Sequence, residues 1–335
     1  MKSLRIVILG FENALPSGIS GYVDLFVLAG MAFRRSPMSA SLPSFEIIVA
    51  TPNGQPFSDG HGRKVKPDRA CEDIDHADAV LIAGFFPNER GMPPDDEAFA
   101  GVAGWLRDRH AGGAMICGSC CGPFVIGVAG LLDGRRCTTT WWLHDEMRRR
   151  FPRADAAWGA SMIEDGRIVT AGGPLSWADL SLHVIRTLVG PDAARLAADF
   201  AVIDTTPMSQ SVYVPPAHLA ASDPFLVTAE QAVRSARGAS LSAAQLAKKL
   251  STSERTLHRR LTRATGEAPR AFIERIRFET ARTLLDTAPN AIKQIALESG
   301  YRDEGSFRRA FRRHAGMTPS AYREWSSQRR GTAKA

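Results

Sequence analysis

The feature that most constrains the fold of this 335-residue chain is an internal repeat near its C-terminus. Residues 256–272 (TLHRRLTRATGEAPRAF) and 306–322 (SFRRAFRRHAGMTPSAY) align without gaps at an offset of 50 residues. A duplicated segment of this length indicates that one small supersecondary unit is built twice. The matched pairs are Leu257 and Phe307, Leu261 and Phe311, Gly266 and Gly316, Pro269 and Pro319, Phe272 and Tyr322, Arg259 and Arg309, and Arg263 and Arg313.

A shorter apolar helix and a turn precede each copy. Apolar residues recur at helical spacing in residues 241–250 and again in residues 291–300, so each helix has one face to bury. Ser251 or Ser253 can cap the helix that follows the first turn, and Ser251 with Glu254 fits a capping box. A helix, a tight turn and a second helix rich in arginine predict a helix-turn-helix in each copy.

The matched apolar pairs fix the buried side of each second helix, so its arginines lie on the exposed side. In helix-turn-helix proteins the second helix enters the major groove, where its early residues reach base edges and arginines hold phosphates. We therefore expect contacts to double-stranded promoter DNA from Arg255, Thr256, Arg259, Arg263, Ser306, Arg308, Arg309, Arg312 and Arg313.

A single helix is expected to join the two units, over residues 269–288, bounded by Pro269 and Pro289. Its 20 residues span about 30 Å, close to the length of one DNA turn, about 34 Å. This spacing predicts that the two reading helices enter successive major grooves on one side of the duplex.

The charge of the chain is divided unevenly along its length. Residues 223–335 carry 22 Lys and Arg, of which 18 are Arg, against 11 Asp and Glu, which gives +11, whereas residues 1–222 carry −4. Arginine suits phosphates and guanine edges, which favours nucleic acid as the partner. A solvated basic surface or a helical protein-binding module is the alternative.

Residues 225–327 resemble the DNA-binding domain of the AraC family, above all in the stretch QIALESGYRDEGSFRRAFRRHAGMTPSAYR. One departure is Gly305, where the family usually has serine. The resemblance implies control of transcription at a promoter.

The first part of the chain contains short apolar runs that alternate with segments compatible with helices. Such runs, apolar on both faces, predict an α/β domain with a parallel sheet covered on both sides. Asp165-Gly166 predicts a hairpin turn, and residues 209–215 a last strand. The four runs are residues 4–10, 45–50, 79–83 and 114–117.

Domain boundaries follow from a cluster of proline, small and polar residues without apolar periodicity. We expect a first domain at residues 1–216, a linker at 217–224, a DNA-binding domain at 225–328 and a disordered tail at 329–335. No run of about 18 apolar residues and no signal peptide is apparent, so we expect a cytoplasmic protein without a membrane partner. Five cysteines, three of them clustered, predict free thiols.

The three clustered cysteines lie in residues 115–124 (MICGSCCGPF), and the segment 118–142, GSCCGPFVIGVAGLLDGRRCTTTWW, joins a strand to a helix. A thiol at Cys120 would sit on a tight turn at a helix N-terminus, which lowers a thiol pKa. The segment resembles the cysteine elbow of the class I glutamine amidotransferase-like superfamily, which includes PfpI-type proteases. That resemblance implies a doubly wound, flavodoxin-like fold, and the combination with an AraC-like tail resembles GlxA-type regulators.

Catalysis by this elbow would need more than its cysteine. The superfamily's acidic partner falls on Ser17 or Gly18, although Glu12 could reach back, and Thr140 stands where relatives commonly have histidine. We therefore expect no enzymatic activity, no catalytic residue, no metal and no cofactor. Instead we expect a ligand pocket at the carboxyl ends of the strands, formed by Cys120, Cys121, Gly84, Phe85, Thr140, Gly173 and Pro174.

The expected protein is thus a transcriptional regulator controlled by a small metabolite and dimerising through its first domain. The resemblance suggests an amino acid or a quaternary amine as the ligand. Two alternatives stay open. One is an amidase or hydrolase with His144 or His183 as base; the other is a thiol redox or thiophilic-metal sensor at Cys120 and Cys121.

Overall fold

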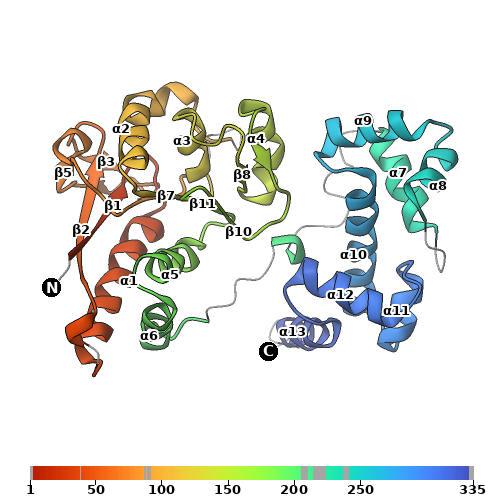
Figure 1. Ribbon diagram of the computed structural model, residues 1–335. Coiled ribbons are helices and arrows are strands. Elements are labelled where there is room, and N and C mark those ends of the chain that lie inside the picture. Colours follow the sequence, from red (N-terminus) through yellow and green to blue (C-terminus); the bar gives the residue numbers. More distant parts are fainter. Residues whose placement is uncertain are drawn as a thin grey trace. The chain divides into compact units, whose positions relative to one another are not determined.

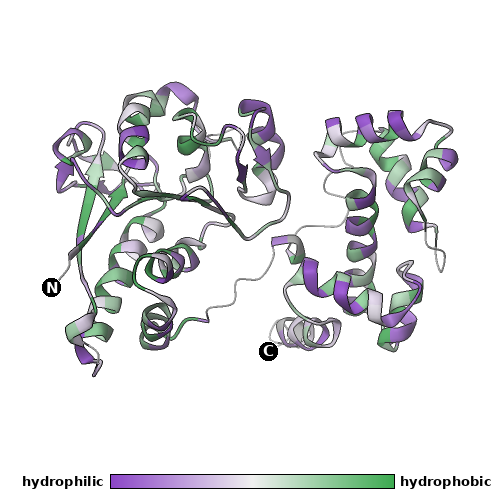
Figure 2. Ribbon diagram, in the orientation of Figure 1, coloured by the Kyte–Doolittle hydropathy of each residue, from purple (hydrophilic) through white to green (hydrophobic). Residues whose placement is uncertain are grey.

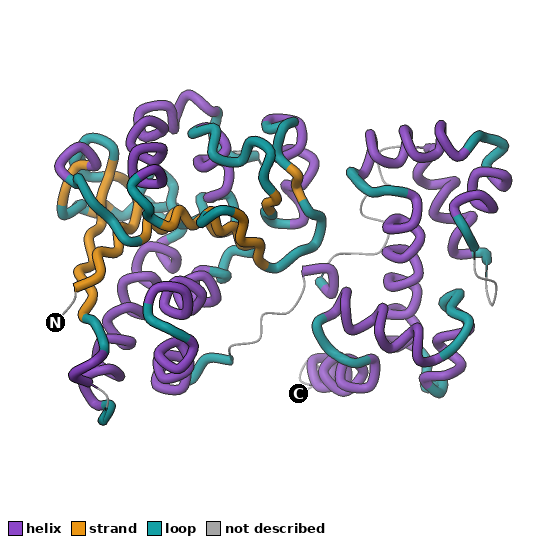
Figure 3. The backbone as a smooth tube through the Cα atoms, viewed as in Figure 1, coloured by secondary structure: helices purple, strands orange, loops and turns teal. Residues whose placement is uncertain are grey.

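The computed structural model divides the chain into two compact units, Met1–Pro207 and Met208–Ala335 (Figure 1). All strands of the described residues belong to the first unit, and the second is helical (Figure 3). The predicted linker at 217–224 lies outside the described residues except for Pro224. The described residues are 3–37, 39–86, 88, 92–204, 210–213, 224–236 and 241–331.

The first unit is built on a seven-stranded sheet in the order β10-β11-β7-β6-β1-β2-β5, parallel except for β10. The predicted doubly wound α/β fold is confirmed, and each of the four apolar runs forms a strand of this sheet. The central strands are buried on both faces, as their continuous apolar sequences require. The strands are β1 (Ser3–Leu9), β2 (Ser44–Thr51), β5 (Arg69–Ala70), β6 (Ala79–Ile82), β7 (Met115–Ser119), β10 (Met162–Asp165) and β11 (Ile168–Ala171).

Helices cover both faces of this sheet. Helices α1, α5 and α6 pack together on one face, while α2 and α3 cover the other (Figure 1). Helix α1 is long and apolar enough to cross a membrane, but half of that stretch is buried in the core of the unit. The helices are α1 (Pro16–Arg35), α2 (Ala100–Ala111), α3 (Gly122–Val128), α4 (His144–Arg150), α5 (Trp177–Leu188) and α6 (Pro191–Ala201).

Smaller elements complete the first unit. Two short two-stranded ladders and four 3-10 turns join the main elements. They are β3 (Phe57–Ser58) with β4 (Lys64–Val65), β8 (Arg136–Cys137) with β9 (Asp155–Ala156), η1 (Ser39–Ser41), η2 (Cys71–Asp73), η3 (Asp96–Phe99) and η4 (Trp141–Leu143).

Two local predictions need correction. The hairpin forms, but Asp165 pairs with Ile168, so the turn residues with positive φ are Gly166 and Arg167, one position later than predicted. The predicted strand at 209–215 is wrong, because residues 210–212 form a 3-10 turn, η5 (Gln210–Val212). Val212 packs in the core of the second unit, and the first unit ends at Pro207, whereas the sequence predicted a first domain that extends to residue 216.

The second unit contains two helix-turn-helix pairs, α8 with α9 and α11 with α12, on either side of the long helix α10. The predicted joining helix is confirmed within one residue at its C-terminal end, and α13 extends into the predicted tail. The helices are α7 (Pro224–Arg234), α8 (Ala243–Lys249), α9 (Glu254–Thr265), α10 (Pro269–Thr287), α11 (Ile292–Glu298), α12 (Glu304–Ala315) and α13 (Pro319–Gly331).

Side-chain caps fix the starts of the reading helices. Ser253 accepts a hydrogen bond from the Thr256 amide, 3.1 Å away, and Asp303 caps α12 in the same way. The predicted capping box at Ser251 is wrong, because that residue lies in the turn with a φ of +50°; the box forms at the start of α8 instead.

Each pair has its own apolar core, and α10 contributes to both. Phe272 and Ile276 pack with the first pair, whereas Phe278 and Leu285 pack with the second. Helix α10 also carries Arg275, which is only 2% exposed and is surrounded by carboxylates. Figure 2 shows the contrast between apolar strands such as β1 and the largely hydrophilic α9.

Candidate DNA-reading surface and cysteine elbow

The reading helices present the residues that the sequence assigned to DNA. Leu257 and Leu261 of α9, like Phe307 and Phe311 of α12, are fully buried, as the repeat predicts. Thr256 and Ser306 are half-buried beside the caps, and the arginines among the nine predicted residues are exposed. The arginine side chains are therefore accessible to a ligand.

Two of these arginines already contact carboxylates. Arg308 pairs with Glu304 one turn earlier on α12, at 2.6 Å. Arg313 pairs with Glu274 of α10, at 2.8 Å, across two different helices. Glu274 is not predictable from the sequence, because nothing in the local pattern shows that α10 and α12 bring it beside Arg313.

The cysteine elbow is a sharp turn between β7 and α3. Cys120 has a φ of +58°, a conformation that side chains other than glycine rarely adopt. Its amide donates to the carbonyl of Ala171 at 2.9 Å, and its carbonyl accepts from the Thr139 hydroxyl at 2.7 Å. Gly84 is required here, since a Cβ at that position would lie 2.6 Å from the Cβ of Cys120.

The two adjacent thiols are buried against each other. Cys120 and Cys121 are 3% and 2% exposed, and their sulfur atoms lie 3.6 Å apart. The hydrogen bond between the thiols, together with burial, holds the pKa of Cys120 well above its usual range. The expected lowering of that pKa is therefore wrong, because the hydrogen bond with Cys121 and the removal of the thiol from water both raise it.

The structure brings together part of the predicted pocket. Gly84 packs on Cys120, and the sulfur of Cys121 lies 3.5 Å from the carbonyl oxygen of Phe85. Thr140 is fully buried, and its hydroxyl has no hydrogen-bond partner among the described residues. Gly173 and Pro174 follow β11 in the turn beyond Ala171; Gly173 is half-buried and Pro174 is exposed.

The candidate acids and bases make their described contacts with residues other than the elbow cysteine. A side chain at Gly18 has no room, because its Cβ would lie 2.8 Å from the Cβ of Ala83, and Ser17 is exposed. Glu12 accepts from the Ser58 amide. His144 bonds to the carbonyl of Ala156 and His183 to Glu164. None of these contacts involves Cys120.

Comparisons with known proteins match both units. Residues 26–187 match the DJ-1/PfpI family, and residues 246–324 match a helix-turn-helix domain. The HTH-type transcriptional regulator CdhR of Pseudomonas aeruginosa is 26% identical over 81% of this chain and 80% of its own length. The HTH-type transcriptional regulator GlxA of Rhizobium meliloti is 26% identical over 88% of this chain and 89% of its own length.

The chain carries a DJ-1/PfpI domain followed by an AraC-type helix-turn-helix domain. The family resemblance of both parts of the sequence is thereby confirmed. An enzyme also resembles part of this chain: isonitrile hydratase of Pseudomonas putida is 30% identical over 47% of this chain and 65% of its own length. The relatives that span most of the chain are regulators.

Proposed function

We propose that the first unit of this regulator binds a small metabolite at the cysteine elbow, and that the bound metabolite changes the affinity of the second unit for promoter DNA. The observation that carries the proposal is the elbow itself. It keeps the strained backbone of Cys120 but has no acid or base on the thiol among the described residues. Strain of this kind persists where a site depends on it.

A ligand site at the elbow is also supported by unsatisfied polarity. The buried hydroxyl of Thr140 adjoins Thr139, which bonds to the carbonyl of Cys120. A buried hydroxyl without a partner is unfavourable, and a ligand group can satisfy it. An amino acid or a quaternary amine is the class that we propose, and binding can act only through unequal affinity for two states of the protein.

A thermal-shift screen of amines and amino acids tests this site. A ligand at 100 times its dissociation constant should stabilise the protein by about 2.7 kcal/mol. Gly84→Ala should abolish that shift, because its Cβ would press on Cys120 and displace the elbow. The matched control is Gly101→Ala on α2, where an added Cβ meets nothing within 4 Å. A full shift in Gly84→Ala would place the ligand elsewhere.

Substitution of Cys120 separates sensing from catalysis. The similarity to isonitrile hydratase favours a cysteine-dependent hydratase or hydrolase as the second candidate. We expect Cys120→Ala to keep a ligand-dependent transcriptional response, since no step of sensing needs a nucleophile. Turnover of a nitrile-like or amide substrate that this substitution abolishes would support the enzyme instead.

The thiol-sensor alternative has a separate readout. Mild peroxide should leave the masses of Cys120 and Cys121 unchanged if the elbow only binds a metabolite, because both side chains are almost fully buried, even though the hydrogen bond between the thiols lowers the pKa of Cys121. A disulfide between the two sulfurs, 3.6 Å apart, or a sulfenate on either would favour redox sensing.

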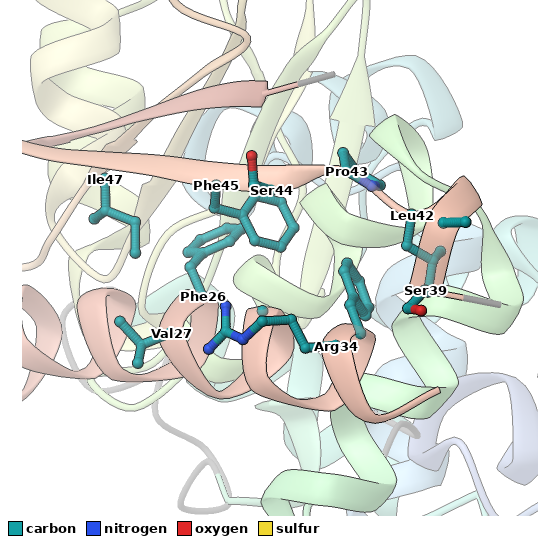
Figure 4. A pocket seen from close by; sticks show the side chains of 12 residues that line it. Phe26, Val27, Arg34, Ser39, Leu42, Pro43, Ser44, Phe45 and Ile47 are labelled. Atoms are coloured by element: carbon teal, nitrogen blue, oxygen red, sulfur yellow. The ribbon is translucent and has the colours of Figure 1, made fainter. Parts of the chain in front are cut away.

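We further propose that the protein acts in the cytoplasm and dimerises through its first unit. An open apolar pocket of about 630 Å³ lies between α1 and β2, where Phe26 and Phe45 are in edge contact (Figure 4). On the same helix, Val27 and Met31 are 45% and 39% exposed. A second copy of the unit would cover these apolar side chains, as homodimer interfaces do.

A further inference from the structure

A second open pocket, of about 490 Å³, lies between α10 and α12 of the second unit. Five of its lining residues are arginines, which come from three separate segments of the chain. They are Arg270 and Arg277 of α10, Arg302 of the turn before α12, and Arg309 and Arg313 of α12.

Tyr301 forms part of the wall of this pocket. It is 8% exposed, and its hydroxyl is buried without a hydrogen-bond partner among the described residues. The guanidinium of Arg277 lies 5.9 Å from the centre of its ring. Burial raises the pKa of Tyr301 to about 12, so the hydroxyl keeps its proton and remains a hydrogen-bond donor at neutral pH.

Two carboxylates also line the pocket, and both are engaged. Asp303 accepts from the Ser306 amide as the cap of α12. Glu274 places one oxygen 3.4 Å from Arg270 and the other 2.8 Å from Arg313. Five guanidinium groups against two carboxylates leave a clear excess of positive charge, and Glu274 occupies the arginines in the way an external anion would.

The internal repeat shows that the pocket is not a requirement of the helix-turn-helix. At the offset of 50 residues, Tyr301 and Arg302 correspond to Ser251 and Thr252 in the first copy. The first copy therefore has neither the buried hydroxyl nor the arginine beside it. The second copy carries this chemistry as an addition to the shared fold.

We propose that this pocket binds a phosphate group of the DNA backbone beside the groove read by α12, and that Glu274 competes with that phosphate. The inference rests on the proposed DNA contacts of α12, since Arg309 and Arg313 belong both to those contacts and to the lining of the pocket. On binding, Arg313 exchanges the carboxylate of Glu274 for a phosphate oxygen. Tyr301 and Arg302 then add a phenolic hydroxyl and a guanidinium, where the first copy has only the hydroxyls of Ser251 and Thr252.

The test is the affinity of the full chain for duplex DNA over a series of salt concentrations. Arg302→Ala should weaken binding roughly fivefold to tenfold near 0.1 M salt and lower the salt slope by about 1, for any duplex sequence. Arg195→Ala, an equal loss of charge in the first unit, is the control. Equal effects of the two substitutions would overturn the proposal.

Glu274→Gln should change DNA affinity in the opposite direction to Arg302→Ala. It should tighten duplex binding about threefold or more, because Arg313 is released and a negative charge leaves the phosphate site. Glu298→Gln, which removes an equal charge from α11, should leave affinity unchanged. Tyr301→Phe should weaken binding, while Tyr322→Phe, whose hydroxyl bonds to Asp286, should not. Unchanged binding in both Glu274→Gln and Tyr301→Phe would contradict the proposed site.

Two further outcomes are distinguishable from these. If the wild-type chain does not bind duplex DNA at low salt, the proposed function is wrong, whatever the pocket variants show. If millimolar ATP protects the wild type against thermal unfolding, and the substitutions alter that protection but not duplex affinity, then the pocket takes a free nucleotide phosphate and the DNA assignment is wrong.

Discussion

Arg275→Met should destabilise the second unit by about 3–5 kcal/mol, the usual effect of removing one member of a buried ion network. Arg275 is 2% exposed and bonds to Glu267 at 3.0 Å and to Glu279 at 2.7 Å, with Glu230 3.6 Å away. Its loss would remove a cation from all three carboxylates, while Arg234 would still contact Glu230 and Glu279. Buried charges without partners are what make such a change severe.

This loss of stability would be measured by chemical denaturation of the full chain, in a variant whose other five tryptophans are replaced by phenylalanine, so that the fluorescence reports on Trp325 alone. Arg270→Met is the matched control, because Arg270 lies on the same helix with an exposed side chain and one contact at 3.4 Å. Its effect should stay within about 0.5 kcal/mol. Equal stability of the two variants would show that the network contributes nothing.

The pH dependence of the stability difference between the wild type and Arg275→Met gives an independent check. Burial already raises the pKa of Glu230 in the wild type, and loss of Arg275 removes an opposing charge. A carboxyl with a folded-state pKa above its unfolded value stabilises the fold below the unfolded pKa, and this contribution is lost as the pH rises through the folded pKa. The loss of unfolding free energy in Arg275→Met should therefore become smaller as the pH falls from about 7 toward 5.

This network shows what the sequence could not predict. The repeat located both reading helices and α10, because apolar residues at helical spacing determine which side is buried. Arg275 and its partners have no such periodicity, and they come together only when α7 and the turn after α9 pack on α10. Sequence alone counts Arg275 among the basic residues available to DNA.

The elbow is predictable to a similar extent. The apolar runs and the glycines placed Cys120 at the end of a buried strand, which the structure confirms. Contacts between distant segments could not be predicted from the sequence. They include the hydrogen bond from Thr139 to the Cys120 carbonyl and the close approach of Gly18 to Ala83, which leaves no room for an acidic side chain at Gly18. The close approach explains why Gly18 carries no acidic side chain, and the lack of catalysis stays a prediction.

Arg309→Ala and Arg259→Ala should each weaken binding to the operator by about 1–3 kcal/mol if the side chain reads a base. Both lie exposed on a reading helix, opposite the buried pairs of α12 and α9. Comparison of operator with unrelated duplex DNA separates two roles: a base contact loses discrimination, whereas a phosphate contact loses affinity for all sequences alike. Unchanged affinity and salt dependence in both variants would mean that the wrong face has been assigned.

The double variant tests whether the two units read DNA independently. Helix α10 has 19 residues and is therefore about 28 Å long. Arg259 and Arg309 are carried by helices on separate apolar cores, so no shared contact couples them. Effects of distant, independent sites add within about 0.5 kcal/mol. The loss in the double variant should thus equal the sum of the single losses, and a loss no larger than either single one would show that only one unit contacts DNA at a time.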